Sequence, residues 1–193
     1  MKRKILLVSG HPDKESFNVA LYEAYKKGAL ESGAELSELI IRDLNFNPNL
    51  EFGYRKEMEL EPDLVEALEK IKAADHIVWV FPMWWYSIPA IMKGFIDRAF
   101  LPGIAFKFEE GKPLPKKLLK GRSARIIVTA DTPNFFDRLF MRRPMLNQFK
   151  RGTLEFCGIK PVGVTYIAPL RDSKEEWRKK WLAKVEQLGR DQK

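Results

Sequence analysis

The chain alternates short apolar segments with longer ones in which apolar residues recur at every third or fourth position. This alternation constrains the fold more than any other feature. Short apolar runs are typical of strands buried on both faces of a parallel sheet, and the longer spacing is typical of amphipathic helices. The expected strands cover residues 5–8, 36–44, 76–81, 124–130 and 162–167. The expected helices cover residues 16–33, 63–74, 89–100, 145–156 and 173–188.

Strands that alternate with helices imply a parallel sheet covered by helices on both faces. Five strands in 193 residues fit a doubly wound α/β fold with the flavodoxin-like strand order 2-1-3-4-5. A closed eight-stranded barrel typically needs ~250 residues. No segment has the composition of a linker, so we expect one domain over residues 1–193. Residues 45–62 are expected to form a long excursion, and residues 105–119 an irregular excursion or a hairpin.

In this strand order, ligands bind beyond the carboxyl ends of the strands, between the first and the third. The loops expected there are residues 9–15, 82–88 and 131–134. The first loop leads into a helix that starts with Ser16, Phe17 and Asn18, where free backbone N–H groups and the helix dipole favour a phosphate. A plain helix cap by Ser16 with a solvated Asn18 explains these residues equally well. His11, in a proline-bounded loop, can likewise be structural.

The second loop is the most aromatic stretch of the sequence. It contains Pro82, Met83, Trp84, Trp85 and Tyr86. Exposing three large aromatic side chains without a ligand would be costly, so we expect an aromatic wall that suits a flat heteroaromatic ring such as isoalloxazine. Packing of one tryptophan inward or across a dimer interface is the alternative.

The net charge of +8 and the pI near 9.5 favour acidic partners, which include nucleic acid, anionic membranes and phosphate-bearing cofactors. Lys and Arg are scattered and interrupted by apolar and acidic residues. This pattern favours a solvated surface, with a ligand-site entrance that attracts phosphate, over a groove that binds nucleic acid. Cys157 is the only cysteine, which excludes an intrachain disulfide and disfavours a zinc site. We therefore expect no bound metal and a cytoplasmic protein. No apolar run approaches the ~20 residues of a membrane span, so no membrane insertion is expected.

Several motifs together resemble one known family. Its most specific part here is the element Phe-Pro-x-x-Trp-x-x-x-Pro-Ala-x-x-Lys-Gly, which lies in the segment 81–100. The weaker parts are Gly10-His11-Pro12, Ser16-Phe17-Asn18, Asn45-Phe46-Asn47-Pro48 and Phe156-Cys157-Gly158. The chain resembles the flavodoxin-like NAD(P)H:quinone oxidoreductases of the DT-diaphorase type along most of its length.

The resemblance implies a set of cofactor-binding residues. His11, Ser16, Phe17 and Asn18 would hold the phosphate end of a flavin, and Pro82, Met83, Trp84, Trp85 and Tyr86 would line its ring. Thr129, Ala130, Asp131 and Thr132 stand where family members have a Thr-Thr-Gly-Gly-like loop. The two glycines are missing, and the acidic Asp131 could alter the flavin potential or the choice of acceptor. The family's Tyr and His that assist flavin reduction have no counterpart in residues 134–143, so no catalytic residue is assigned.

The resemblance also implies an activity. A flavin-dependent NAD(P)H oxidoreductase would reduce quinones or similar flat aromatic acceptors in a ping-pong reaction. FMN is expected rather than FAD, because the chain is short for the family and lacks both the Gly-Gly loop and the C-terminal extension of the FAD-using relatives. A homodimer is expected, because family members complete each flavin cleft with a second subunit and because the helix 89–100 and the aromatic excursions offer apolar surface. Two alternatives remain open: a flavodoxin-like electron carrier, and an ancillary regulatory subunit of a potassium-efflux transporter.

Overall fold

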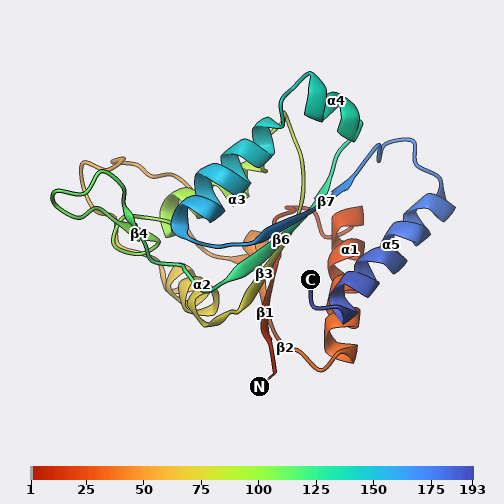
Figure 1. Cartoon of the computed structure of the whole chain (residues 1–193), viewed down its shortest axis with the longest axis horizontal. Coiled ribbons are helices and arrows are strands. Elements are labelled where there is room, and N and C mark those ends of the chain that lie inside the picture. Colours follow the sequence, from red (N-terminus) through yellow and green to blue (C-terminus); the bar gives the residue numbers. More distant parts are fainter. Residues whose placement is uncertain (1) are drawn as a thin grey trace.

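The computed structural model describes residues 2–193, and a five-stranded parallel sheet lies at its centre (Figure 1). The strand order is β2-β1-β3-β6-β7, which confirms the predicted flavodoxin-like order. The strands of this sheet are β1 (Lys4–Ser9), β2 (Glu35–Ile40), β3 (His76–Pro82), β6 (Ser123–Thr129) and β7 (Val162–Ile167). The short strands β4 (Phe106–Lys107) and β5 (Lys116–Lys117) pair antiparallel as a separate hairpin within the expected excursion.

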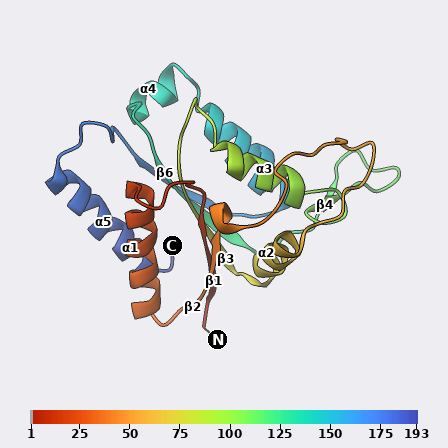
Figure 2. The ribbon, with the colours of Figure 1, turned by 180° about the vertical axis from the view of Figure 1, so that it is seen from behind.

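Helices cover both faces of the sheet. The α-helices are α1 (Phe17–Glu31), α2 (Pro62–Ala73), α3 (Ala90–Ala99), α4 (Asn134–Leu139) and α5 (Glu175–Arg190). A 3-10 turn, η1, covers Ile41–Asp43, and a π-helix, η2, covers Leu146–Glu155. Figures 1 and 2 show α1 and α5 side by side on one face, with α2 and α3 on the other.

Alternate residues of each central strand pack against opposite helical layers. On β3, Trp79 and Phe81 belong to the core beneath α2, α3 and η2, whereas Val78 and Val80 belong to the core beneath α1 and α5. Burial on both faces explains why this strand is an unbroken apolar run in the sequence. The core on the α2 and α3 side also takes in Cys157, and burial raises the pKa of its thiol to about 11, as expected of a small apolar group.

Two glycines allow α1 and α5 to cross in backbone contact. A Cβ atom on Gly28 would lie 1.9 Å from the carbonyl oxygen of Glu186, and one on Gly189 would lie 2.3 Å from that of Tyr25. Larger side chains would push the helices apart. The close crossing holds the C-terminal parts of α1 and α5 together, and nearer their starts the two helices are joined by Arg178, which lies over the ring of Phe17.

A fully buried arginine anchors the long excursion between η1 and α2. The guanidinium of Arg98 on α3 donates from Nη1 and Nη2 to the two carboxylate oxygens of Glu61, at 3.1 and 2.9 Å. It also donates to the carbonyl oxygens of Asn47 and Glu59, at 2.6 and 2.9 Å. Arg98 therefore holds a segment without regular structure against α3.

The structure corrects four details of the expected elements. The second strand ends at Ile40, because the chain turns into η1 rather than staying extended to residue 44. The helix expected over 145–156 is wound as a π-helix, and α4 was not expected at all. The helix 89–100 offers little apolar surface for a dimer, because its apolar residues are buried in the chain's own core. Among residues 2–193, no helix is both long enough and apolar enough to cross a membrane.

Candidate functional site

The three loops expected to build a site do meet at the carboxyl edge of the sheet, around the ends of β1, β3 and β6. The ring of His11 packs edge-on against that of Trp84, with the centroids 5.4 Å apart, which joins the first loop to the second. The backbone N–H of Met83 donates to the carbonyl oxygen of Thr129 at 2.7 Å, which joins the second loop to the end of β6. The strand order reverses between β1 and β3, so this is the position where a doubly wound sheet binds ligands.

The start of α1 has the properties of an anion site. Ser16 occupies the N-cap position, yet its side chain makes no capping bond, and its buried Oγ has no hydrogen-bond partner. The N–H groups of Phe17 and Asn18 precede the first helical hydrogen bond, which Val19 makes to the carbonyl oxygen of Ser16. No acidic residue lies in the first turn. Unsatisfied donors at the positive end of a helix dipole attract a phosphate, and plain capping by Ser16 does not describe this geometry.

The side chain of Asn18 is buried and bonded within the chain, so it is not solvated and has little capacity left to contact a ligand. It is 2% exposed, and its Nδ2 donates to Oγ1 of Thr129 at 2.9 Å. This bond crosses from α1 to the end of β6. Asn18 therefore fixes the third loop beside the helix start, and its backbone N–H stays available at the site.

His11 presents one free ring nitrogen. Its Nδ1 accepts a hydrogen bond from the backbone N–H of Asp13 at 2.9 Å, so the neutral ring carries its proton on Nε2. Partial burial lowers the pKa of His11 below its ordinary value, against the opposing effect of Asp13. At neutral pH the ring is uncharged and offers Nε2–H as a donor.

The aromatic loop is a tight turn that presents an indole to solvent. Trp84 and Ser87 exchange two backbone hydrogen bonds, of 3.1 and 2.9 Å. Between them, Trp85 and Tyr86 have φ angles of 49° and 56°, in the left-handed region that non-glycine residues rarely adopt. Trp84 is 44% exposed against His11, whereas Trp85 is 97% exposed. The alternative that one tryptophan packs inward therefore applies in part to Trp84 and not to Trp85.

The turn is held from beneath by two contacts that the sequence did not reveal. Oγ of Ser87 donates to Oε1 of Gln148 on the π-helix at 2.9 Å, and Oγ1 of Thr132 lies 3.4 Å from the hydroxyl of Tyr86. The hydroxyl of Tyr166, at the end of β7, donates to the carbonyl oxygen of Thr132 at 2.9 Å. Gln148 and Tyr166 had no motif to mark them, since they reach the loop only through the fold.

The third loop is fastened to the loop after β7. The carboxylate of Asp131 accepts a hydrogen bond from the backbone N–H of Arg171 at 2.8 Å and pairs with its guanidinium at 3.1 Å. The N–H of Leu170 donates to the carbonyl oxygen of Ala130 at 3.0 Å. Asp131 thus carries a partner cation, which offsets the negative charge expected beside a flavin.

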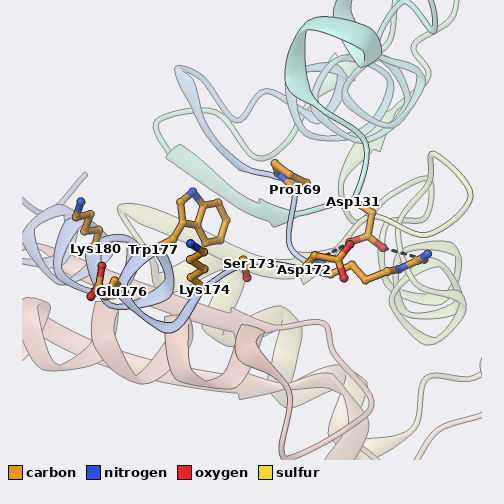
Figure 3. A pocket seen from close by; sticks show the side chains of 9 residues that line it. Asp131, Pro169, Asp172, Ser173, Lys174, Glu176, Trp177 and Lys180 are labelled. Carbon is orange, nitrogen blue, oxygen red and sulfur yellow. Dashed lines mark hydrogen bonds and ion pairs between the residues drawn. The ribbon is translucent and has the colours of Figure 1, made fainter.

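A hollow of about 580 Å³ adjoins this loop. Figure 3 shows Asp131 and Pro169 at one side of it and the first turns of α5, with Trp177 and Lys180, at the other. Arg178 of the same helix lies over the ring of Phe17, with its guanidinium carbon 5.6 Å from the ring centroid. Arg178, in the basic stretch 171–184, therefore places a cation beside the start of α1, a role that scattered charge in the sequence could not indicate.

The unexpected helix α4 adds exposed aromatic surface next to the site. Its segment exposes five large apolar side chains: Phe135, Phe136, Leu139, Phe140 and Met141. On its inner side, Asp137 is buried, one of its carboxylate oxygens has no partner, and burial raises its pKa despite nearby Arg143. Asp137 is thus an acidic group in residues 134–143, the region where no counterpart of the family's Tyr and His was found.

Comparison with known proteins defines the class. Residues 3–188 match the family model described as having a flavodoxin-like fold. Because the match spans nearly the whole chain, the chain belongs to that family, and the family resemblance inferred from its motifs is confirmed.

Individual relatives agree with this membership. Ribosyldihydronicotinamide dehydrogenase (quinone) of Mus musculus is 28% identical over 209 residues, which cover 94% of this chain and 88% of that protein. The crystal structure of Smu.1420 from Streptococcus mutans UA159 matches with a TM-score of 0.86 and 30% identity, over 97% of this chain and 99% of that one. An FMN-dependent NADH-azoreductase from Bacillus anthracis, solved in complex with FMN, shares the fold, with a TM-score of 0.76, 18% identity, and coverage of 98% and 99%.

Proposed function

We propose that this protein binds FMN and transfers electrons from NAD(P)H to quinones or similar flat aromatic acceptors. One observation carries the proposal. At one edge of the sheet, the start of α1, whose Ser16 hydroxyl and first N–H groups lack partners, lies next to the turn that exposes the indole of Trp85. Family membership supports it, since curated relatives are NAD(P)H dehydrogenases (quinone) and an FMN-dependent azoreductase shares the fold. The enzyme class is accordingly that of an NAD(P)H dehydrogenase (quinone)-type oxidoreductase.

The residues present fit the phosphate end of FMN. The buried Oγ of Ser16 needs a partner, the N–H groups of Phe17 and Asn18 are free of helical bonds, and Nε2 of His11 is a further donor. A dianionic phosphate would satisfy these groups together. Arg178 adds positive potential over Phe17.

The residues around the aromatic turn fit the ring of FMN. Pro82 and Met83 lie at the end of β3, and Trp84, Trp85 and Tyr86 form the turn that follows. Thr129, Ala130, Asp131 and Thr132 approach from β6 without the family's two glycines, so we assign them the outer edge of the ring rather than close backbone contact with its face.

When bound, the flavin supplies the hydride and electron chemistry. The chain's own part is to hold the ring, to exclude water with the aromatic turn, and to leave one ring face open. Donor and acceptor would occupy that face in turn, which makes the proposed kinetics ping-pong. The carboxyl of Asp137, whose pKa burial raises, remains outside this assignment because no contact links it to the ring position.

We also propose a homodimer, on grounds that differ from those the sequence suggested. Trp85, Phe135, Leu139 and Phe140 are all more than half exposed and flank the site. A second copy that covered them would remove a large apolar area from water and close the cleft. Light scattering near 22.5 kDa at micromolar concentration would exclude the dimer.

The decisive experiment is an absorbance spectrum of the purified protein, followed by acid release and mass spectrometry of the cofactor. FMN bands and a released mass of FMN are expected, and release of FAD would correct the cofactor alone. A colourless protein that takes up neither flavin on titration refutes the proposed function. Initial rates at several fixed quinone concentrations should give parallel double-reciprocal plots against NAD(P)H, whereas intersecting plots would contradict the ping-pong order.

A further inference from the structure

The outer edge of β7 is open along its length. β7 is the last strand of the sheet and pairs only with β6. Pro161 accepts a bond from Ala124, and Ile167 accepts one from Ala130, so the odd-numbered residues face β6. Parallel strands bond through alternate residues, so the N–H and C=O groups of Val164 and Tyr166 point away from the sheet. Within residues 2–193, no backbone group pairs with them.

A groove of about 460 Å³ runs beside this edge, between α5 on one face and α4 with η2 on the other. Val164, Thr165 and Tyr166 form its floor. Trp181, Lys184 and Leu188 of α5 line one wall, and Asn134, Arg143 and Leu146 line the other. The groove therefore has both an unpaired strand edge and side chains on either side of it.

The charge of the groove has one sign. Arg125, Arg143 and Lys184 line it, and no carboxylate does. Arg125 lies across Gly163, where a Cβ atom would meet its Nη2 at 3.0 Å, and it donates to Oγ1 of Thr165 at 3.0 Å. The buried Nε atoms of Arg125 and Arg143 have no partner. Two guanidiniums thus flank the strand edge, and each uses one terminal nitrogen in a bond within the chain, Arg125 to Thr165 and Arg143 to Oδ1 of Asn134 at 3.2 Å.

We propose that the β7 edge is a docking site for an acidic polypeptide segment in extended conformation, which adds to the sheet as a sixth strand. The outward N–H and C=O groups of Val164 and Tyr166 would pair with its backbone, as in recognition by strand addition. Its acidic side chains would reach Arg125, Arg143 and Lys184. A second copy of this chain fits poorly, because the same three cations would face each other.

The test uses the full-length protein and a dye-labelled peptide in which Glu and Val alternate. Its control is the same peptide with alternate backbone amides methylated, which keeps the charge and removes the pairing donors. Fluorescence anisotropy should show the first peptide binding at least about tenfold more tightly than the second, the equivalent of one or two hydrogen bonds. Equal binding of the two peptides, or no binding of either, overturns the proposal.

Hydrogen exchange distinguishes strand addition from plain charge attraction. Peptide binding should slow exchange of the Val164 and Tyr166 amides by about tenfold or more, and leave the Gly163 and Thr165 amides unchanged because they already bond to β6. Unchanged exchange at Val164 and Tyr166 overturns the proposal even if the peptide binds, since the cations would then serve only to attract anions or to repel other strands. Displacement of the peptide by millimolar inorganic phosphate without any amide protection likewise overturns it.

Two substitutions test the chain itself. Val164→Pro removes one outward N–H while leaving the bonds to β6 in place, and should weaken peptide binding about tenfold. Lys184→Glu should weaken it about fivefold or more, whereas Lys179→Glu, the same charge change at an exposed position of α5 outside the groove, should change it less than about twofold. If Val164→Pro does not fold, the methylated peptide and the Lys184 and Lys179 pair decide the question. Equal effects of the two lysine substitutions count against the site.

Discussion

Replacing Trp85 by Ala should damage flavin binding more than replacing Trp84. Trp85 is 97% exposed in the free protein, so its indole contributes almost nothing to folding and its whole exposed face is available to a ligand. If about half of a ~200 Å² indole is covered by the flavin ring, ~100 Å² at ~25 cal/mol per Å² gives about 2.5 kcal/mol. The expected loss is therefore about 1–3 kcal/mol, or ~5–150-fold in affinity.

Trp84 provides the matched comparison. It is 44% exposed and packs edge-on against His11, so Trp84→Ala should remove an aromatic contact of about 0.5–1.5 kcal/mol inside the protein and less area from the cofactor wall. Trp85→Gly is a second control, because glycine adopts the left-handed φ of 49° without strain and should raise the free energy of unfolding by up to about 1 kcal/mol. Trp85→Gly should still lose flavin affinity, so stability and binding would change in opposite directions.

Titration of each apoprotein with FMN, followed by quenching of flavin fluorescence, measures the affinities, and urea unfolding checks that each variant folds. If folded Trp85→Ala binds FMN as tightly as the unmodified protein, the aromatic turn does not form the cofactor wall. The assignment of residues 82–86 would then be withdrawn. A greater loss of FMN affinity for Trp84→Ala than for Trp85→Ala would instead assign the main ring contact to Trp84, beside His11.

Three further outcomes are expected. Ser16→Ala should weaken FMN binding by about 1–2 kcal/mol while leaving riboflavin binding and urea stability unchanged, because the lost hydroxyl has no partner in the protein itself; equal losses for both ligands would contradict a phosphate role. Arg98→Met should lower the free energy of unfolding by about 3–5 kcal/mol in urea melts, because it leaves the Glu61 carboxylate without its bidentate partner; a loss below about 1 kcal/mol would contradict this anchor. Burial lowers the pKa of His76 to about 3, below its unfolded value near 6.5, so stability should be full above pH 6.5 and fall by about 2–3 kcal/mol by pH 4.5; His76→Gln should flatten that slope, and an unchanged slope would refute the cause.

The sheet could be predicted from the sequence because its strands are buried on both faces. The segment 76–81 has no polar alternation, which only a covered strand tolerates, and the structure places its residues in both cores. The strand order then followed from length and alternation alone. A helix over 145–156 was predicted, but its π-helical winding was not, and α4 was missed because its apolar side chains are largely exposed.

The positions of the candidate site loops were predictable, but the contacts that order them were not. A doubly wound sheet must bring the ends of β1, β3 and β6 together, so the loop sequences were enough to locate the site. The bond from Asn18 to Thr129 joins residues 111 positions apart, and the pair of Asp131 with Arg171 joins two loops. Neither has a local pattern. From the sequence alone, the amide of Asn18 and the charges of Asp131 and Arg171 would be expected to face solvent, because their partners come from distant parts of the chain.

Several unfavourable local features of this protein lie together at the carboxyl edge of the sheet. Trp85 and Tyr86 adopt left-handed backbone angles, the Trp85 indole is exposed, and Oγ of Ser16 is buried without a partner. Each of these costs free energy in the isolated chain, on the order of 1–3 kcal/mol. Away from this edge, the α1 and α5 crossing and the Arg98 anchor tie the layers together closely. Under the proposed function, the phosphate of a bound flavin would supply the partner that Oγ of Ser16 lacks, and its flat ring would cover the Trp85 indole, so the free energy of binding would offset part of this cost.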